Sequence, residues 1–405
     1  MKPAILILNA GSSSVKFAVY AQADTLPVLL RGSIAALGSA PRLTLHSLAE
    51  AYPDRLIGDA PMSPGTAGQV IFDELARRGM TDAITAVGHR IVHGGLHFTQ
   101  QTILTAAVTS QLTELTPLAP LHQPANLEIV ALARDHLPEA LQVGAFDTAF
   151  HAGRPQLDRL YALPRSLNDD GIVAYGFHGL SYAHIAAVLR VRDGPRAGGR
   201  AIVAHLGSGA SLCAMNAGQS IATTMGFSAL DGLVMSTRCG ALDPAIVLHL
   251  LQERQMTAEA VQDLLHNRSG LLGVSQISGG MATLLQSADP RAAGAIALFV
   301  YCAGRAIGSL AAALCGLDTL VFTAGIGEHA PRIRALICQS AAWLGARMVT
   351  GLNTLGETVI SDRRSGVEIL VRPADEERTV ATGVLACMRQ GPDAPPRVEA
   401  CGPSP

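Results

Sequence analysis

The sequence contains little charge, few aromatic residues and almost no lysine. Charged residues make up 15% of its 405 positions and aromatic residues 4%, while lysine occurs only at Lys2 and Lys16. The formal net charge is −2 and no basic run stands out, which argues against a nucleic-acid-binding surface. Hydrophobic residues make up 49%, enough for large buried cores, and the length favours two domains or one large one.

Signals for a metal cluster and for secretion are also missing. The seven cysteines form an odd number without metal-ligand spacing, and there is no HExxH motif, so a zinc site is not expected. Free thiols in a reducing cytosol explain the cysteines most simply. The apolar run from Ala4 to Leu8 is far too short for a signal peptide. We therefore expect a cytoplasmic protein that does not associate with a membrane.

One apolar stretch, from Ala292 to Gly316, has the length of a membrane span. Arg305 lies near its centre, where burial in lipid would be costly. Asp289 and Pro290 before it are typical of a helix start, and Gly316 is typical of a helix end. We predict a buried helix of a globular domain.

Apolar β-branched segments alternate with helical patterns through most of the length, which indicates an α/β architecture with buried sheets. The predicted strands are Ile5–Leu8, Thr85–Val92, Gln142–Phe146, Ala201–His205, Thr319–Thr323 and Val367–Val371. The predicted helices include Ala67–Arg78, Pro124–His136, Tyr182–Arg192, Ala245–Glu253 and Pro331–Trp343. The last stretch, Gly391–Pro405, is rich in Pro and Gly and is expected to be a flexible tail.

Two segments far apart in the chain share one pattern. Ile5–Val19 and Ile202–Met215 each consist of an apolar strand, a tight turn of Gly and Ser, and a second strand. The repeat predicts two similarly built domains, each placing one such turn at a shared cleft.

The first turn, Gly11–Ser14, offers backbone N–H groups and hydroxyls that suit a phosphate chain, and Lys16 could reach a phosphate oxygen. An ordinary hairpin with a solvated lysine is equally open from these residues alone. Gly207–Ser211 could likewise bind a phosphate, and an ordinary hairpin is again equally open from these residues alone. In Val321–His329 we expect a strand, a glycine turn and then a helix, with glycine allowing a flat group or a phosphate to approach.

Four polar residues lie in otherwise apolar surroundings. Arg90 and Asp147 each end an apolar strand, where open α/β sheets keep their sites, His178 is held between glycines, and Arg238 precedes another glycine. An arginine there can fork onto a carboxylate or a phosphate. The alternative is structural ion pairs and a core histidine, and single residues favour that alternative.

Together these segments resemble the acetate kinase family, within the acetate and sugar kinase/actin superfamily, from about Ile5 to Glu377. The resemblance is carried by Asn9–Phe17, Gly88–Arg90, Phe146–His151, Tyr175–Gly179 and Thr237–Gly240. It implies an α/β fold of two duplicated ribonuclease-H-like domains with a central nucleotide cleft, the actin-like ATPase fold. It also implies a homodimer and reversible in-line phosphoryl transfer from ATP to acetate, giving acetyl phosphate and ADP. The expected domains are residues 1–147, joined by a C-terminal helix at about 377–390, and residues 148–376.

The resemblance also implies roles for individual residues. Asp147, Arg90, Arg238 and His178 match the catalytic positions. Arg90, Val92, Leu121 and Phe177 match the acid-binding pocket. Ser12, Ser14, Lys16, His205, Gly207, Ser208, Gly209, Gly325, Ile326 and Gly327 match positions that contact nucleotide or phosphate. Asn9 and Glu376 match the positions near Mg²⁺ or Mn²⁺, with Glu377 as a close rival.

Several positions depart from the family pattern. Ser208 stands where asparagine is usual, Ser236 where glycine is usual, and Ala229 where a pocket proline is usual. Gly280 and Ala282 stand where an Asp and an Arg normally cradle the base. The smaller Ala229 is compatible with a longer acid, so a propionate kinase is the first alternative. A kinase for a small hydroxyl compound, with Asp147 as base, and a nucleotide-driven module of the actin or chaperone type are the others.

Overall fold

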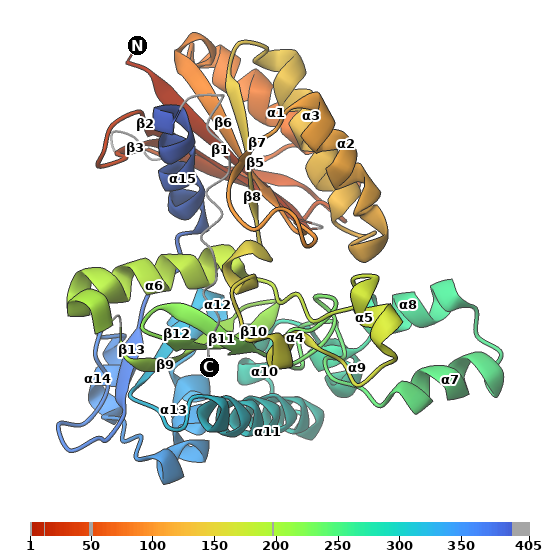
Figure 1. Cartoon of the computed structure of the whole chain (residues 1–405), viewed down its shortest axis with the longest axis vertical. Coiled ribbons are helices and arrows are strands. Elements are labelled where there is room, and N and C mark those ends of the chain that lie inside the picture. Colours follow the sequence, from red (N-terminus) through yellow and green to blue (C-terminus); the bar gives the residue numbers. More distant parts are fainter. Residues whose placement is uncertain (1, 12, 48–51, 197, 391–405) are drawn as a thin grey trace. The chain divides into compact units, whose positions relative to one another are not determined.

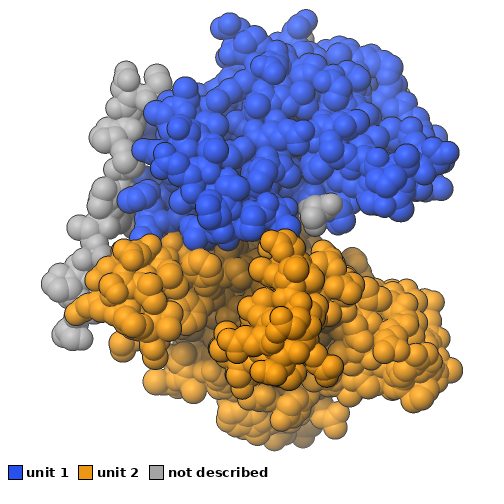
Figure 2. Space-filling model, turned by 90° about the vertical axis from the view of Figure 1, so that its right-hand side faces the viewer, with its two compact units in different colours: residues 1–152, 375–405 blue, residues 153–374 orange. Residues whose placement is uncertain are grey.

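A computed structural model describes residues 2–11, 13–47, 52–196 and 198–390, which form two compact units (Figure 2). Unit 1 comprises Met1–Ala152 and Asp375–Pro405, and unit 2 comprises Gly153–Ala374. The chain therefore passes from unit 1 to unit 2 and back again. The predicted tail, Gly391–Pro405, lies outside the described residues.

The described part of unit 1 contains an eight-stranded sheet in the order β5-β4-β3-β2-β1-β6-β8-β7. The first three strands pair antiparallel, β6 is parallel to β1, and β8 is parallel to β6. The strands are β1 (Ala4–Ala10), β2 (Ser14–Ala21), β3 (Val28–Ala35), β4 (Arg42–His46), β5 (Arg55–Leu56), β6 (Ile84–Ile91), β7 (Thr102–Ile103) and β8 (Leu141–Phe146).

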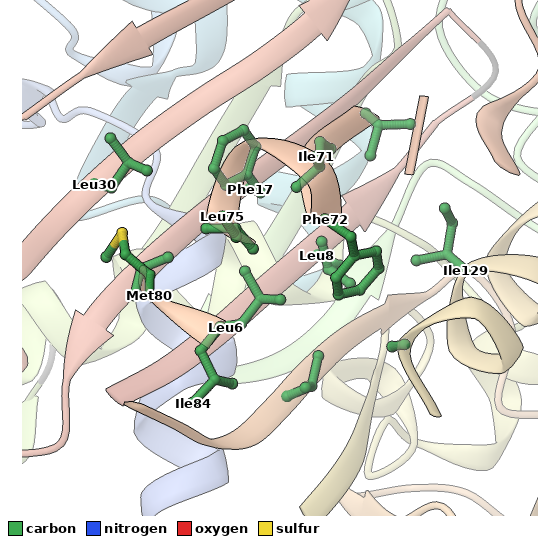
Figure 3. Packing of buried hydrophobic residues seen from close by; sticks show 14 of the residues in the cluster. Leu6, Leu8, Phe17, Leu30, Ile71, Phe72, Leu75, Met80, Ile84 and Ile129 are labelled. Carbon is green, nitrogen blue, oxygen red and sulfur yellow. The ribbon is translucent and has the colours of Figure 1, made fainter. Parts of the chain in front are cut away.

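Helices cover both faces of this sheet (Figure 1). α1 (Pro64–Arg77) and α3 (Gln123–His136) pack on one face, with α2 (Ala106–Glu114) beside α3, while α15 (Glu376–Gln390) packs on the other. Alternate residues of each strand point to opposite faces. Leu6 and Leu8 of β1 accordingly join Phe17, Ile71 and Phe72 in the core beneath α1 (Figure 3).

The described part of unit 2 contains a five-stranded sheet in the order β11-β10-β9-β12-β13. Its strands are β9 (Arg200–Leu206), β10 (Ala210–Asn216), β11 (Gln219–Thr223), β12 (Thr319–Thr323) and β13 (Glu368–Val371). α6 (Gly179–Asp193) and α11 (Pro290–Ala313) lie on opposite faces of it (Figure 1). The remaining helices are α4 (Gln156–Arg159), α5 (Arg165–Asp169), α7 (Pro244–Gln252), α8 (Ala258–Asn267), α9 (Gly270–Ser275), α10 (Met281–Gln286), α12 (Ala324–His329), α13 (Pro331–Ser340) and α14 (Thr350–Leu355).

The two sheets repeat one topology. In unit 2, β9, β10 and β11 pair antiparallel, β12 is parallel to β9, and β13 is parallel to β12, as in the central five strands of unit 1. Each set of strands is followed in the chain by a helix that belongs to the other unit. α6 follows the strands of unit 1 but packs in unit 2, and α15 follows the strands of unit 2 but packs in unit 1. The duplication predicted from the two glycine turns is therefore present.

The apolar stretch forms α11, a helix long and apolar enough to cross a membrane by length and composition. Asp289 caps its N-terminus by accepting a hydrogen bond from the Arg291 N–H, and Pro290 opens the first turn, as predicted. Only one face is buried, through residues such as Phe299 and Ile307, while Tyr301 on the other face is 62% exposed. The helix predicted to be buried is thus buried on one face, where it packs on β10.

Candidate active site

The first glycine turn joins β1 to β2 in a hairpin. The Gly11 N–H donates to the Ser14 carbonyl over 2.8 Å, and the strands are in register from Ala10 and Val15 outward. Lys16 is exposed, whereas its neighbours Val15 and Phe17 are buried, so the lysine ammonium is available at the surface of unit 1. Ser12 lies outside the described residues.

Four predicted site residues of unit 1 form one hydrogen-bonded chain. The Arg90 guanidinium donates to both oxygens of Asp147, with Nη2 at 2.6 Å from Oδ2 and Nε at 3.1 Å from each oxygen. Its Nη1 donates to the Asn9 side-chain oxygen over 3.0 Å. The Asn9 amide then donates to Glu376 over 3.3 Å. Residues from β1, β6, the end of β8 and the start of α15 thus meet at the carboxyl ends of parallel strands.

Opposite charges stabilise this hydrogen-bonded group of side chains. Burial alone would lower the pKa of Arg90, but the carboxylates of Asp147 and Glu376 outweigh it and raise that pKa, so the guanidinium stays charged. Burial, and then the neighbouring Glu376 charge, raise the pKa of Glu377, which Lys16 partly offsets. Two adjacent carboxylates at the start of α15 therefore repel each other beside a permanent cation.

Asn126 positions the two strand ends that carry Asn9 and Arg90. Its side chain is 3% exposed, accepts a hydrogen bond from the Val92 N–H over 2.9 Å and donates to the Ala10 carbonyl over 2.8 Å. Sequence reasoning missed it, because an asparagine inside a helical pattern gives no local signal. Val92, predicted to line the acid pocket, is buried, whereas Leu121 is 40% exposed.

In unit 2, His178 is held in an unusual backbone conformation. It precedes α6 with φ 59° and ψ 21°, in the left-handed region that side chains rarely adopt. The adjacent Phe177, also predicted for the acid pocket, is 2% exposed. The His178 ring stacks on the ring of His205, with centroids 4.2 Å apart. This strained position directs the imidazole over the end of β9.

The second glycine turn lies directly beside His178 and Arg238. A Cβ added at Gly209 would be 2.8 Å from Arg238 Nη2 and 3.1 Å from His178 Nε2, so only glycine lets both side chains approach this backbone. The Ser236 N–H donates to the Ser208 carbonyl over 3.1 Å, which ties the arginine segment to the turn. Arg238 Nη1 donates to the Ala229 carbonyl over 2.6 Å.

The segment around Gly325 differs from the prediction. We expected a glycine turn between strand and helix, but α12 begins directly after β12, with Gly325, Ile326 and Gly327 inside it. Of the two glycines, Gly327 is the closely packed one. A Cβ at Gly327 would be 3.3 Å from the Phe322 carbonyl carbon and 3.5 Å from the Ala204 oxygen, so glycine lets this helix lie against β9 and β12.

Sequence reasoning also missed the residues around His178. Ser211 bonds to His178 directly and Tyr182 bonds to Ser211, and neither was predicted to act on His178. Two signals were present: Ser211 ends the second glycine turn, and Tyr182 follows His178 by four residues, one helical turn. Gly280 precedes α10 and Ala282 lies in its first turn, and both are exposed.

Comparisons with known proteins identify the family of the chain. The model of the acetokinase family matches residues 4–382. An acetate kinase of Rhodopseudomonas palustris is 48% identical over 393 residues, covering 95% of this chain and 98% of that protein. The structures of a propionate kinase from Francisella tularensis (32% identity, TM-score 0.88, 95% and 99% of the two chains) and of Porphyromonas gingivalis acetate kinase (33%, 0.84, 95% and 100%) are similar. They confirm the predicted actin-like ATPase fold and the resemblance drawn from the motifs.

Proposed function

The chain belongs to the acetokinase family, and from this we propose that it transfers a phosphoryl group reversibly from ATP to acetate, giving acetyl phosphate and ADP. Family membership covers nearly the whole chain, so both units fall within it. It makes the protein a phosphotransferase whose acceptor is a carboxyl group.

The single observation in the site that carries this proposal is that the Asp147 carboxylate is buried and paired with Arg90. Both its oxygens accept hydrogen bonds from Arg90, and it is 1% exposed. A hydroxyl acceptor would need this carboxylate as a general base, yet it is occupied by a permanent cation. A carboxylic acid with a pKa of about 4–5 is already ionised at neutral pH and needs no base. The arrangement favours a carboxylate acceptor over a hydroxyl acceptor.

The chain's own residues then have to offset the repulsion between an anionic acceptor and the phosphates. We assign Arg90 and the apolar Val92, Leu121 and Phe177 to the acid. We assign Arg238 and His178 to the phosphoryl group in transfer, where charge spreads over the equatorial oxygens. Asp147 keeps the Arg90 fork oriented. Positioning and electrostatic stabilisation supply the rate.

The phosphate chain of ATP is assigned to the two glycine turns. We assign to it Ser12, Ser14 and Lys16 from the first turn, and His205, Gly207, Ser208 and Gly209 from the second. Gly325, Ile326 and Gly327 are assigned to the adenosine side. This assignment extends the family resemblance to each matching position, and mutation of each turn tests it separately.

Mg²⁺ or Mn²⁺ is the expected cofactor, and the residues present fit it. Such cations take oxygen ligands and bind through one or two carboxylates plus substrate phosphates. Glu376 and Glu377 are adjacent carboxylates whose repulsion a cation would relieve, and the Asn9 amide contacts Glu376. In the described residues no three His, Cys, Asp or Glu side chains form a metal cluster, which is consistent with phosphates completing the shell. When bound, the cation neutralises phosphate charge.

We also propose a cytoplasmic homodimer. The six described cysteines are free thiols, as a reducing compartment requires. α7 has no buried residue although its sequence is largely aliphatic, and Ile246 and Leu248 are 44% and 52% exposed. A second copy of the chain would cover this helix. Light scattering should give a dimer mass, and Leu248→Glu should give a monomer; a wild-type monomer would contradict this.

The deciding experiment is hydroxamate formation from ATP and Mg²⁺ with acids of two to four carbons. Hydroxylamine should trap an acyl phosphate, with acetate ahead of propionate. A preference for propionate would make the chain a propionate kinase, as the name of the Francisella relative and the small Ala229 allow. An acid-stable phosphorylated alcohol without hydroxamate would favour the hydroxyl kinase. Negligible stimulation of ATP turnover by acids would favour a nucleotide-driven module.

A further inference from the structure

Two stacked histidines of unit 2 are each held at Nδ1 by a serine. His178 Nδ1 lies 2.8 Å from Ser211 Oγ, and His205 Nδ1 lies 2.8 Å from Ser181 Oγ. The two bonds link the same helix and sheet in opposite directions. His178 precedes α6 and is bound by a serine of β10, while His205 is in β9 and is bound by a serine of α6. Both serines are fully buried, with 0% exposure. Each ring is therefore held at its Nδ1 atom by a buried hydroxyl.

The opposite nitrogen of each ring faces the second glycine turn. His178 Nε2 is 3.1 Å from the position of a Cβ at Gly209, and His205 Nε2 is 3.9 Å from that at Gly207. These are the backbone positions assigned to phosphate. Whether an Nε2 atom there carries a hydrogen decides whether it attracts or repels an anion.

A third buried group sets the direction of the hydrogen bonds at His178. The Tyr182 hydroxyl lies 2.5 Å from Ser211 Oγ, and Tyr182 is 0% exposed. Burial, and then Cys213, raise the pKa of Tyr182 well above its usual value, so the phenol keeps its proton. A phenol is a more acidic hydroxyl than serine and is the better donor in a short bond. With Tyr182 as the donor, the Ser211 hydrogen is left for His178 Nδ1.

We propose that Tyr182 and Ser211 are positioning residues that fix neutral His178 as the Nε2–H tautomer. Tyr182 O–H donates to Ser211 Oγ, Ser211 O–H donates to His178 Nδ1, and the ring's hydrogen is on Nε2. His178 then presents a donor toward Gly209 without needing a net charge. The role of that donor in phosphoryl transfer rests on the proposed function, whereas the tautomer itself does not.

The tautomer can be read directly by two-bond proton–nitrogen correlation spectra of protein labelled with ¹⁵N-histidine, at about pH 8 so that the rings are neutral. Comparison with His178→Gln identifies the His178 signals. We expect the Nε2–H pattern in the wild type and a shift toward Nδ1–H in Ser211→Ala. A wild-type Nδ1–H pattern, or a pattern that Ser211→Ala leaves unchanged, would overturn the proposal.

Kinetics give a second readout. Ser211→Ala should lower kcat about tenfold, as loss of an orienting partner typically does, with KM for ATP within about twofold of wild type. Ser211→Cys, which keeps a weak donor of similar size, should recover part of that loss. Tyr182→Phe should lower kcat severalfold, whereas Tyr175→Phe, which removes a buried hydroxyl bonded to the Gly171 carbonyl, should not.

A double-mutant cycle separates positioning from general loss of structure. In a His178→Gln background, Ser211→Ala should cause no further loss of kcat, because the ring that it orients is gone. An equal loss in both backgrounds would contradict the positioning role. If the wild type forms no acyl phosphate from any acid, the proposed function fails, while the spectra still decide the tautomer.

Discussion

Arg90 and Asp147 lie 57 residues apart in the chain and form a two-pronged ion pair, with Nη2 at 2.6 Å from Oδ2. Asp147 is 1% exposed, so its charge depends on the arginine for compensation. The same guanidinium also reaches Asn9, which contacts Glu376. A residue assigned to the substrate is therefore also a structural partner of Asp147 and Asn9.

This dual role predicts different outcomes for two substitutions of Arg90. Arg90→Ala removes the guanidinium that compensates the buried Asp147 charge, which should lower the free energy of unfolding by about 3–5 kcal/mol as well as stopping turnover. Arg90→Lys keeps a positive charge but loses the fork, so it should cost less stability while lowering kcat/KM for acetate about 10²-fold or more. Urea denaturation and hydroxamate assays measure the two effects. Near-normal activity in Arg90→Lys would remove Arg90 from the site.

Gly209→Ala should damage activity more than stability. The added Cβ would meet Arg238 Nη2 and His178 Nε2, the ends of side chains that can move aside, so the fold should survive. Moving those two groups should lower kcat by about 10²-fold. Gly351→Ala is the matched control, since nothing lies within 4 Å of its Cβ position. Equal kcat values for the two variants would argue against a phosphate role for this turn.

Arg334 should stabilise the segment that contains α12. It is 1% exposed and donates to the carbonyls of Gly327 and Glu328 and to both oxygens of Asn353. Arg334→Met leaves these acceptors unpaired and should lower the free energy of unfolding by about 2–4 kcal/mol and raise KM for ATP. Arg332→Met, at an exposed position of α13, the helix that also carries Arg334, should change neither quantity. An unchanged KM for ATP would separate α12 from nucleotide binding.

Stability should fall in mild acid because of His89. This histidine is 1% exposed and bonds to Gln142, and burial lowers its pKa to about 4 despite that bond. Its unfolded pKa is about 6.5, so between about pH 6.5 and 4 the unfolded state takes up a proton that the folded state refuses. His89 should therefore lower the free energy of unfolding by up to roughly 3 kcal/mol over this pH range. Above about pH 6.5 it should have no effect.

His89→Gln should flatten that pH dependence. Thermal unfolding at pH values from about 4 to 8 measures it. The exposed His97→Gln should keep the wild-type slope. Burial lowers the pKa of His93 to about 4 as well, so the His89 variant should retain part of the slope. A slope identical to wild type in His89→Gln would show that His89 does not control acid stability.

The sequence by itself determined the kind of fold and the chemistry on offer. Alternation of apolar strands with amphipathic helices follows from local side-chain periodicity, and the strand Thr319–Thr323 was predicted to the residue. The two glycine turns revealed the duplication because each is a contiguous motif whose hairpin forms locally. Arg90, Asp147, His178 and Arg238 stood out because charge in apolar surroundings needs a partner.

Only the tertiary structure decided which partners those groups have. Asn9 and Glu376 are 367 residues apart, and they meet because α15 packs on the sheet of unit 1, which contains β1. Pairings such as His178 with Ser211 depend on sheet register and on the packing of α6, which local patterns do not encode. The same holds for α12, which begins directly after β12 and packs closely at Gly327, although its glycines read locally as a turn.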